Sequence, residues 1–264
     1  MQKDGKMTAL VLTHQNLGSV KRTLVESFPN VKSSHLTEAL ASALGCRTHA
    51  SLLNRLKQSD PADPEFALLD EERFLARIQE FGYQPSQNDL IFGPFFCLND
   101  DGVGLINTTP FSGFEITYTT RREKAWRNLM VAAINAGLQQ KLFGLRPGDN
   151  RWPGHDNQQR DAFVFSFDFP DGTPALGSVR DAGHDELSIH AALEPTADGA
   201  RWIQCANAGF SAGNAFASGW LERRRGAWLQ TNIDSFRCRR HVTEKAAAIE
   251  ITPRGFGDRG AIIL

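Results

Sequence analysis

The chain has 264 residues, of which 41% are hydrophobic and 22% are charged, as in an ordinary globular protein. This length allows one large domain or two modest ones. The 29 Lys and Arg residues are balanced by 30 Asp and Glu residues, so the net charge of −1 excludes a histone-like polycation and a broadly acidic tail protein.

The four cysteines lie far apart, and none forms a C-x-x-C pair, which argues against a zinc knuckle or a thioredoxin-like site. The first residues contain no apolar segment of signal-peptide length, and no segment approaches the ~18 apolar residues that cross a bilayer. We therefore expect a cytoplasmic protein that does not contact membranes. No sequence motif requires a cofactor, so we expect none.

Residues 1–60 are predicted to form a small helical module. Apolar residues recur at three- and four-residue spacing through 16–57, which favours three short amphipathic helices. Gly45 suits the left-handed position that follows the second helix, and Thr48 can cap the third helix.

Residues 61–88 are predicted to form a linker followed by an acidic helix. The helix-breaking residues in 59–64 interrupt the helical pattern, and the apolar spacing then favours one helix over 65–82. Segment 61–101 has nine Asp or Glu residues against two Arg residues. Such an excess of acid suits a basic protein partner.

Residues 89–264 are predicted to form an α+β domain. The apolar spacing favours one long helix over 121–143, and four phenylalanines alternate through 162–169, as in a strand with one apolar face. Other strand candidates are 90–98, 103–107, 114–119, 186–193, 200–206, 226–232 and 248–252. Helices and strands do not alternate regularly. We therefore expect an α+β fold in which a small helical module precedes a mainly antiparallel sheet with one long helix.

The segment 28–56 contains the pattern S-S-H-L-x-E-A-L-A-x-x-L-G-x-R-T-H-A-x-L, from Ser33 to Leu52. It resembles a short helical module of uncharacterised bacterial proteins carried on plasmids and integrative elements. More loosely, it is similar to the N-terminal segment of some glyoxalase-superfamily proteins, although Cys46 stands where those have an aromatic residue. The resemblance implies a mobile-element setting, and it carries over no catalytic residue.

The helical module is also a candidate for nucleic-acid contact. Ala41 and Gly45 have the A-x-x-x-G spacing of a helix-turn-helix motif, in which the glycine permits the turn before the recognition helix. Residues 1–60 hold eight Lys or Arg residues against four Asp or Glu residues. The side chains that could then reach phosphates are those of Lys32, Arg47, His49 and Arg55. An ordinary helical hairpin has the same spacing, so simple packing is the alternative.

A second basic cluster lies between residues 221 and 245, a segment that contains seven Lys or Arg residues and three Asp or Glu residues. Its arginines are Arg223, Arg224, Arg225, Arg237, Arg239 and Arg240. Trp220 and Trp228 flank the first three, and interleaved Arg and Trp residues suit phosphate contact and base stacking with DNA or RNA. A solvated hairpin tip is the alternative.

Histidines and carboxylates between residues 155 and 190 form a third candidate. These residue types suit a divalent metal or a general acid–base pair. The candidates are His155, His184, His190, Asp181 and Asp185. His190 and Ser188 would share one face of a strand over 186–193. No zinc-peptidase or deaminase motif is present, so we assign no metal, and a solvated acidic loop is the alternative.

Three functions therefore remain open. The leading hypothesis is an intracellular, non-enzymatic binding or regulatory protein of a mobile element that contacts nucleic acid. The second is a metal-dependent or acid–base hydrolase that uses the His and Asp cluster. The third is a protein-interaction subunit whose acidic segment meets a basic partner.

Overall fold

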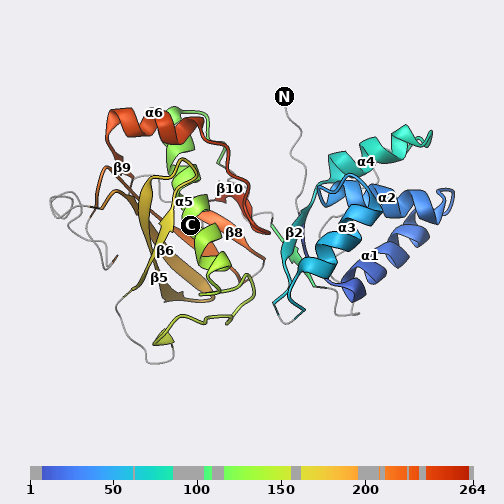
Figure 1. The fold of residues 1–264 in the computed structure, drawn as a ribbon, viewed down its shortest axis with the longest axis horizontal. Coiled ribbons are helices and arrows are strands. Elements are labelled where there is room, and N and C mark those ends of the chain that lie inside the picture. Colours follow the sequence, from blue (N-terminus) through green and yellow to red (C-terminus); the bar gives the residue numbers. More distant parts are fainter. Residues whose placement is uncertain are drawn as a thin grey trace. The chain divides into compact units, whose positions relative to one another are not determined.

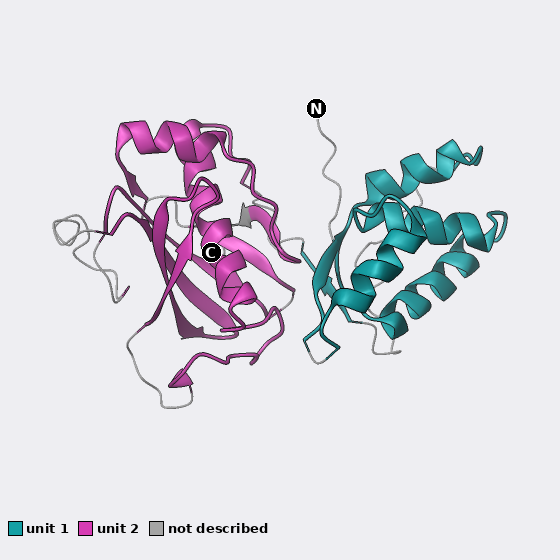
Figure 2. Ribbon diagram, in the orientation of Figure 1, with its two compact units in different colours: residues 1–109 teal, residues 110–264 magenta. Residues whose placement is uncertain are grey.

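The computed structural model describes residues 8–61, 63–85, 104–108, 116–155, 162–195, 208, 212–224, 226–231 and 236–261. The chain divides into two compact units, unit 1 (Met1–Thr109) and unit 2 (Pro110–Leu264), which Figures 1 and 2 show. Each unit has its own sheet and its own helices. No helix in the described ranges is long and apolar enough to cross a membrane.

Unit 1 combines a three-stranded antiparallel sheet with a group of helices (teal in Figure 2). Its strands are β1 (Thr8–Val11), β2 (Phe66–Leu69) and β3 (Leu105–Asn107), in the order β2-β1-β3. Its helices are α1 (His14–Ser27), α2 (Ser33–Ala43), α3 (His49–Gln58) and α4 (Glu71–Glu80).

The helices and the sheet of unit 1 share one hydrophobic core, with α2 at its centre. Helix α2 contacts α1, α3, α4 and β2, and six of its eleven residues are buried. Leu10 of β1, Leu40 of α2 and Phe74 of α4 all lie buried in this core. Because full burial of such a side chain contributes about 1.5–3 kcal/mol, the elements of unit 1 stabilise one another.

The structure differs from the prediction of a linker followed by a single acidic helix. The helix expected over 65–82 is strand β2 followed by helix α4, because β2 pairs with β1 and Asp70 then caps the helix. The Asp70 side chain accepts a hydrogen bond from the backbone N–H of Arg73 at 3.0 Å. The described parts of β2 and α4 therefore belong to the same core as the preceding helices, and the chain divides into its two units after Thr109.

Unit 2 is a mainly antiparallel sheet packed against a long helix. Its strands are β4 (Phe163–Asp168), β5 (Pro174–Gly183), β6 (Glu186–Leu193), β7 (Ala215–Glu222), β8 (Trp228–Thr231), β9 (Arg237–Cys238) and β10 (Gly257–Ala261). Their order is β10-β8-β7-β6-β5-β4, with β9 paired to β7 and β10 parallel to β8. Its helices are α5 (Arg121–Gln139) and α6 (Arg240–Ala248), which pack against each other (Figure 1). The predicted α+β class is confirmed.

Three details of unit 2 differ from the sequence-based expectation. The strand expected over 248–252 is absent: Ala248 ends α6, and the following residues form no strand. Strand β5 occupies a stretch interpreted as an acidic loop, yet it pairs with both β4 and β6. The described part of 114–119 is not a strand. Candidates 90–98 and 200–206 lie outside the described residues.

The two faces of the sheet differ. Val179, Ile189 and Gly219 lie side by side in the register, and a Cβ on Gly219 would lie 3.0 Å from the ring of Trp126 in α5. Phe163 opposes Val179, so the alternating phenylalanines of β4 share this apolar face with them. Because side chains alternate along a strand, the residues between these positions point away from α5. We name that side the far face.

Candidate functional site

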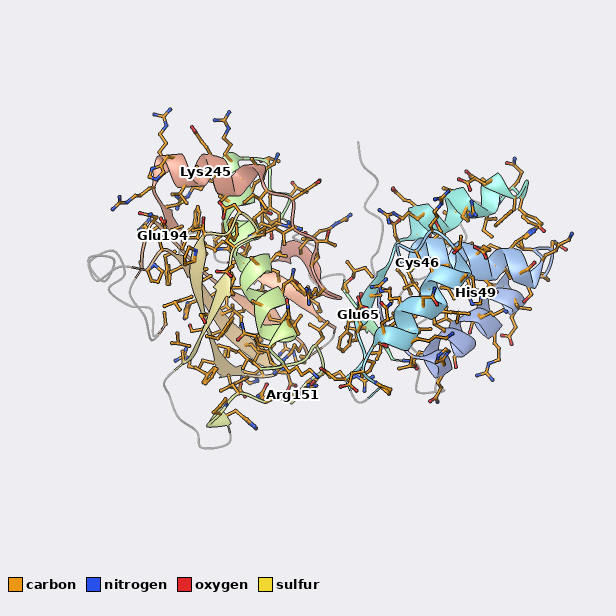
Figure 3. The ribbon with its side chains drawn as sticks, viewed as in Figure 1. Cys46, His49, Glu65, Arg151, Glu194 and Lys245 are labelled. Atoms are coloured by element: carbon orange, nitrogen blue, oxygen red, sulfur yellow. The ribbon has the colours of Figure 1, made fainter. Side chains whose placement is uncertain are left out.

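Exposed basic residues gather on three packed elements of unit 2, namely the start of α5, strand β9 and helix α6. We name them the basic surface; they are Arg121, Arg122, Lys124, Arg237, Arg239, Arg240, His241 and Lys245. The Arg122 guanidinium donates a hydrogen bond to the Phe236 carbonyl and lies 5.0 Å from the centre of the Phe236 ring. This contact ties α5 to β9, and α6 follows β9 directly (Figure 3 labels Lys245 on α6).

Among the described residues, Glu123 and Glu244 lie within the basic surface, and Asp171 lies close enough to Lys245 for their charges to interact. Glu244 is 3.8 Å from Arg121 and 3.9 Å from Arg240, but all three side chains are more than half exposed, so these pairs are weak. Glu123 accepts hydrogen bonds from the backbone N–H groups that precede α5, chiefly that of Thr120 at 2.8 Å, and these bonds lower the pKa of Glu123. The surface therefore keeps an excess of positive charge.

The predicted arginine triplet does not join this surface. Arg223 is 1% exposed, so the expectation that it contacts phosphates is corrected. Its guanidinium donates to the carbonyl groups of Gly144 at 3.2 Å, Asp149 at 3.3 Å and Asp185 at 3.4 Å, and to the Asn150 side chain at 2.8 Å. Burial lowers the pKa of Arg223. Through these hydrogen bonds, Arg223 connects the loop after α5 to the β5–β6 turn.

The other members of that triplet and its flanking tryptophans are placed differently. Arg224 is partly exposed and lies 3.6 Å from the buried Glu222 carboxylate, and Arg225 lies outside the described residues. Trp228 is buried, and Trp220 is half-buried on the far face. Neither tryptophan is fully exposed, so the structure gives no support for base stacking beside the triplet.

The basic residues predicted in unit 1 lie at the two ends of α2. Lys32 precedes α2 and Arg47 follows it, and an eleven-residue helix is about 16 Å long. Arg55 donates to the Leu44 carbonyl at 2.8 Å and pairs with Glu65, a contact that raises the pKa of Arg55. His49 starts α3 and is half-buried. Arg55 therefore lies at the α2–α3 turn that carries Arg47 and His49, whereas Lys32 lies at the other end of α2.

The turn between α2 and α3 agrees with the sequence-based prediction. Gly45 has φ of +75°, the left-handed conformation expected after a helix. Thr48 caps α3, with its side chain accepting from the backbone N–H of Ser51 at 3.1 Å. Glu38 of α2 accepts from the backbone N–H of His49 at 3.1 Å, which fixes α3 against α2. The motif therefore forms a tight turn between two helices that pack against each other.

The predicted histidines and aspartates do not converge. His184 and Asp185 form the β5–β6 turn, whereas His190 lies four residues into β6 from Glu186, which is about 13 Å along the strand. The Asp181 carboxylate accepts from the Gly183 N–H at 2.8 Å. His155 packs edge-on against Trp152. No group of three or more His, Cys, Asp or Glu side chains suited to a metal occurs among the residues that the structure describes.

His190 belongs instead to rows of polar side chains on the far face. The first row is Ser178, His190 and Ser218; the second is Arg180, Ser188, Trp220 and Gln230; the third is Glu186, Glu222 and Trp228. His190 and Ser188 share this face, as predicted. Among the described residues, eight buried polar atoms have no hydrogen-bond partner, and five of them lie here: Ser178 Oγ, Arg180 Nε, His190 Nδ1, Glu222 Oε2 and Trp228 Nε1.

Burial shifts the ionisation of two far-face side chains. It lowers the pKa of His190 to about 4, with a smaller contribution from the Arg180 charge, so the imidazole is neutral at pH 7. It raises the pKa of Glu222 to about 7, and the neighbouring Glu186 carboxyl acts in the same direction. Both groups are therefore less charged than they would be in water.

Sequence reasoning missed parts of both sites. Arg121, Arg122 and Lys124 belong to the basic surface only because α5 packs on α6, and the sequence R-R-E-K was the available signal. Ser178 and Arg180 were missed because β5 was not recognised, although polar residues alternate there. No family model matches the chain, and neither a curated protein nor a solved structure matches it.

Proposed function

We propose that this protein is an intracellular, non-enzymatic binding protein that contacts the phosphate backbone of a nucleic acid through the basic surface of unit 2. The observation that carries the proposal is the gathering of seven exposed Lys and Arg residues on α5, β9 and α6, with two carboxylates among them and a third, that of Asp171, near Lys245. Basic side chains that neutralise phosphates release counterions, and this release supplies most of the affinity for nucleic acids.

The chemistry of the surface favours phosphate over a protein carboxylate patch. Five of its seven cations are arginines, whose planar guanidinium groups match phosphate oxygens in pairs. Arg239 and Arg240 stand where α6 begins, and no side chain caps that end among the described residues. The helix dipole therefore adds to the attraction for an anion.

The alternatives have less support. His190 is neutral, and among the described residues no carboxylate orients its ring, so it would be a weak general base. Of the acidic residues predicted to meet a basic partner, Glu65 pairs with Arg55 and Glu80 with Arg77. A role on nucleic acid also fits the mobile-element setting that the pattern Ser33–Leu52 implies.

The proposal is tested by fluorescence anisotropy with a labelled 20-base-pair DNA duplex at low salt. We expect Arg239→Gln combined with Arg240→Gln to weaken binding at least tenfold. The matched control is Arg254→Gln, which removes an exposed arginine of unit 2 outside the basic surface and should bind like the unmodified protein. Equal affinity of the double variant and the control would contradict the proposal.

A further inference from the structure

We propose that Glu186 and Glu222 form a pH-sensitive switch, which holds the end of the β6–β7 pair and the adjacent β5–β6 turn closed while one of the two carboxyls is protonated. Glu186 begins β6, Glu222 ends β7, and the two residues are directly opposite in the register. Side chains in such a cross-strand pair have Cβ atoms about 4.5–5.5 Å apart, and like charges at these positions destabilise the pairing. The switch involves no residue of the basic surface.

The surroundings of Glu222 oppose its ionisation. Its side chain is completely buried, and its Oε1 atom accepts a hydrogen bond from the backbone N–H of Arg224 at 2.9 Å. Its Oε2 atom has no hydrogen-bond partner among the described residues, and the Arg224 guanidinium, 3.6 Å away, is partly exposed. Burial raises the pKa of Glu222 to about 7, and the Glu186 carboxyl adds to this effect against the smaller, opposite effect of Arg224. Glu222 therefore gains and loses its proton near neutral pH.

The neighbouring elements place their charges farther from the Glu222 carboxyl. Its opposite residue on β8 is Trp228, whose uncharged ring is buried. On β5, the nearest charged side chain of the far face is that of Arg180, one row away, and the β5–β6 turn adds the exposed His184. The guanidinium of Arg223 points to the other face, where it meets the charges of Asp149, Asp181 and Asp185. These elements therefore do not neutralise an ionised Glu222.

The β5–β6 turn depends on a contact beside this pair. Gly183, His184 and Asp185 have φ of +81°, +55° and +62°, and this left-handed conformation is unfavourable for residues that carry a Cβ. The Arg223 N–H, one residue after Glu222, donates to the Asp185 carbonyl at 3.1 Å, and the Arg223 side chain donates to the same carbonyl at 3.4 Å. Repulsion between two ionised carboxylates separates β6 from β7 at this end, so Arg223 loses its acceptor and the turn opens.

Amide hydrogen exchange of the full chain, measured residue by residue by NMR, tests the switch. We compare protection factors, which correct for the intrinsic effect of pH on exchange. Between pH 5.5 and pH 7.5, the Arg223 amide should lose at least tenfold in protection, as expected for a carboxyl with a pKa of about 7 in the closed state and 4.5 in the open state. The Asn214 amide, which donates to the Leu193 carbonyl at the other end of the β6–β7 pair, should keep its protection.

Three variants separate the contributions to this loss. Glu222→Gln removes the titrating carboxyl, so the protection of the Arg223 amide should be the same at both pH values. Glu186→Gln removes the opposing charge while Glu222 stays buried, so the loss should become at least threefold smaller. The control is His184→Asn, which removes the neighbouring imidazole and keeps a residue type that tolerates the left-handed conformation. It should show the full tenfold loss.

The switch is overturned if protection of the Arg223 amide does not change with pH in the unmodified protein, or if the Asn214 amide loses as much. An undiminished loss in either glutamate variant, or an abolished loss in His184→Asn, would also overturn it. None of these measurements involves DNA, so the switch and the proposed function fail independently.

Discussion

At the scale of single residues, the arginines of unit 2 divide into two kinds. Arg223 is enclosed and gives its hydrogen bonds to three backbone carbonyls and one side-chain amide. Arg239 and Arg240 are exposed at the start of α6. The sequence shows all of them as members of one basic cluster, because it carries no information about which guanidinium the fold encloses.

This division predicts different consequences for stability. Arg223→Gln should lower the free energy of unfolding by about 2–4 kcal/mol, because it leaves buried carbonyl groups without donors. Arg224→Gln, at the next position and partly exposed, should change it by less than about 1 kcal/mol. Urea denaturation of both variants checks this. A fully stable Arg223→Gln variant with impaired DNA binding would restore Arg223 as a phosphate contact.

His190 predicts one pH dependence. Its folded pKa of about 4 lies below its ordinary value of 6.5, so the folded state binds this proton less readily than the unfolded state does. The native protein should therefore lose stability as the pH falls from 6.5 to 4. His190→Gln should remove that part of the loss, as measured by thermal unfolding across this range. The idea fails if both proteins lose stability equally.

Glu222 predicts the opposite dependence of stability on pH. Its folded pKa of about 7 lies above its ordinary value of 4.5, so the folded state holds the proton more tightly. The free energy of unfolding should therefore fall as the pH rises from 4.5 to 7, because ionised Glu222 is less favourable in the folded state than in water. Glu222→Gln should gain stability relative to the unmodified protein across that window. A constant difference between the two proteins would show that Glu222 ionises normally.

At the scale of elements, two helical glycines differ in how closely neighbouring atoms approach them. Gly137 lies in α5, and a Cβ there would be 2.5 Å from the buried ring of Phe143. Gly18 lies exposed in α1 with nothing within 4 Å of such a Cβ. Gly137→Ala should therefore destabilise the protein by about 1–3 kcal/mol, whereas Gly18→Ala should stabilise it by about 0.5–1 kcal/mol. Denaturant midpoints of the two variants give the signs, and the same sign for both would contradict the packing described for α5.

Some of these helices and strands could be predicted from the sequence, and others could not. Helix α3 and its start were predictable because Thr48 and Gly45 are local signals of capping and of a left-handed turn. Helix α6 was not, because no side chain caps it and its length is only nine residues. Strand β5 was hidden because its acidic end suggests a solvated loop, whereas pairing on both edges decides its structure. Non-local pairing of this kind leaves a weak local pattern.

At the scale of the whole molecule, a net charge of −1 conceals an uneven distribution. The two basic clusters predicted from the sequence lie in different units, and the structure gathers exposed cations on α5, β9 and α6 of unit 2. Two of the contributing segments, 121–124 and 237–245, are more than a hundred residues apart in the chain. Tertiary packing therefore creates a site that composition and local counts cannot locate.

The most direct test of this account is the salt dependence of duplex binding. For phosphate contacts, the logarithm of the association constant falls linearly with the logarithm of the salt concentration, by about 0.9 for each phosphate neutralised. The account predicts a steep slope for the unmodified protein and a slope smaller by about 2 for the variant with Arg239→Gln and Arg240→Gln. Binding that is insensitive to salt, or an unchanged slope in this variant, would contradict the basic surface as the nucleic-acid contact.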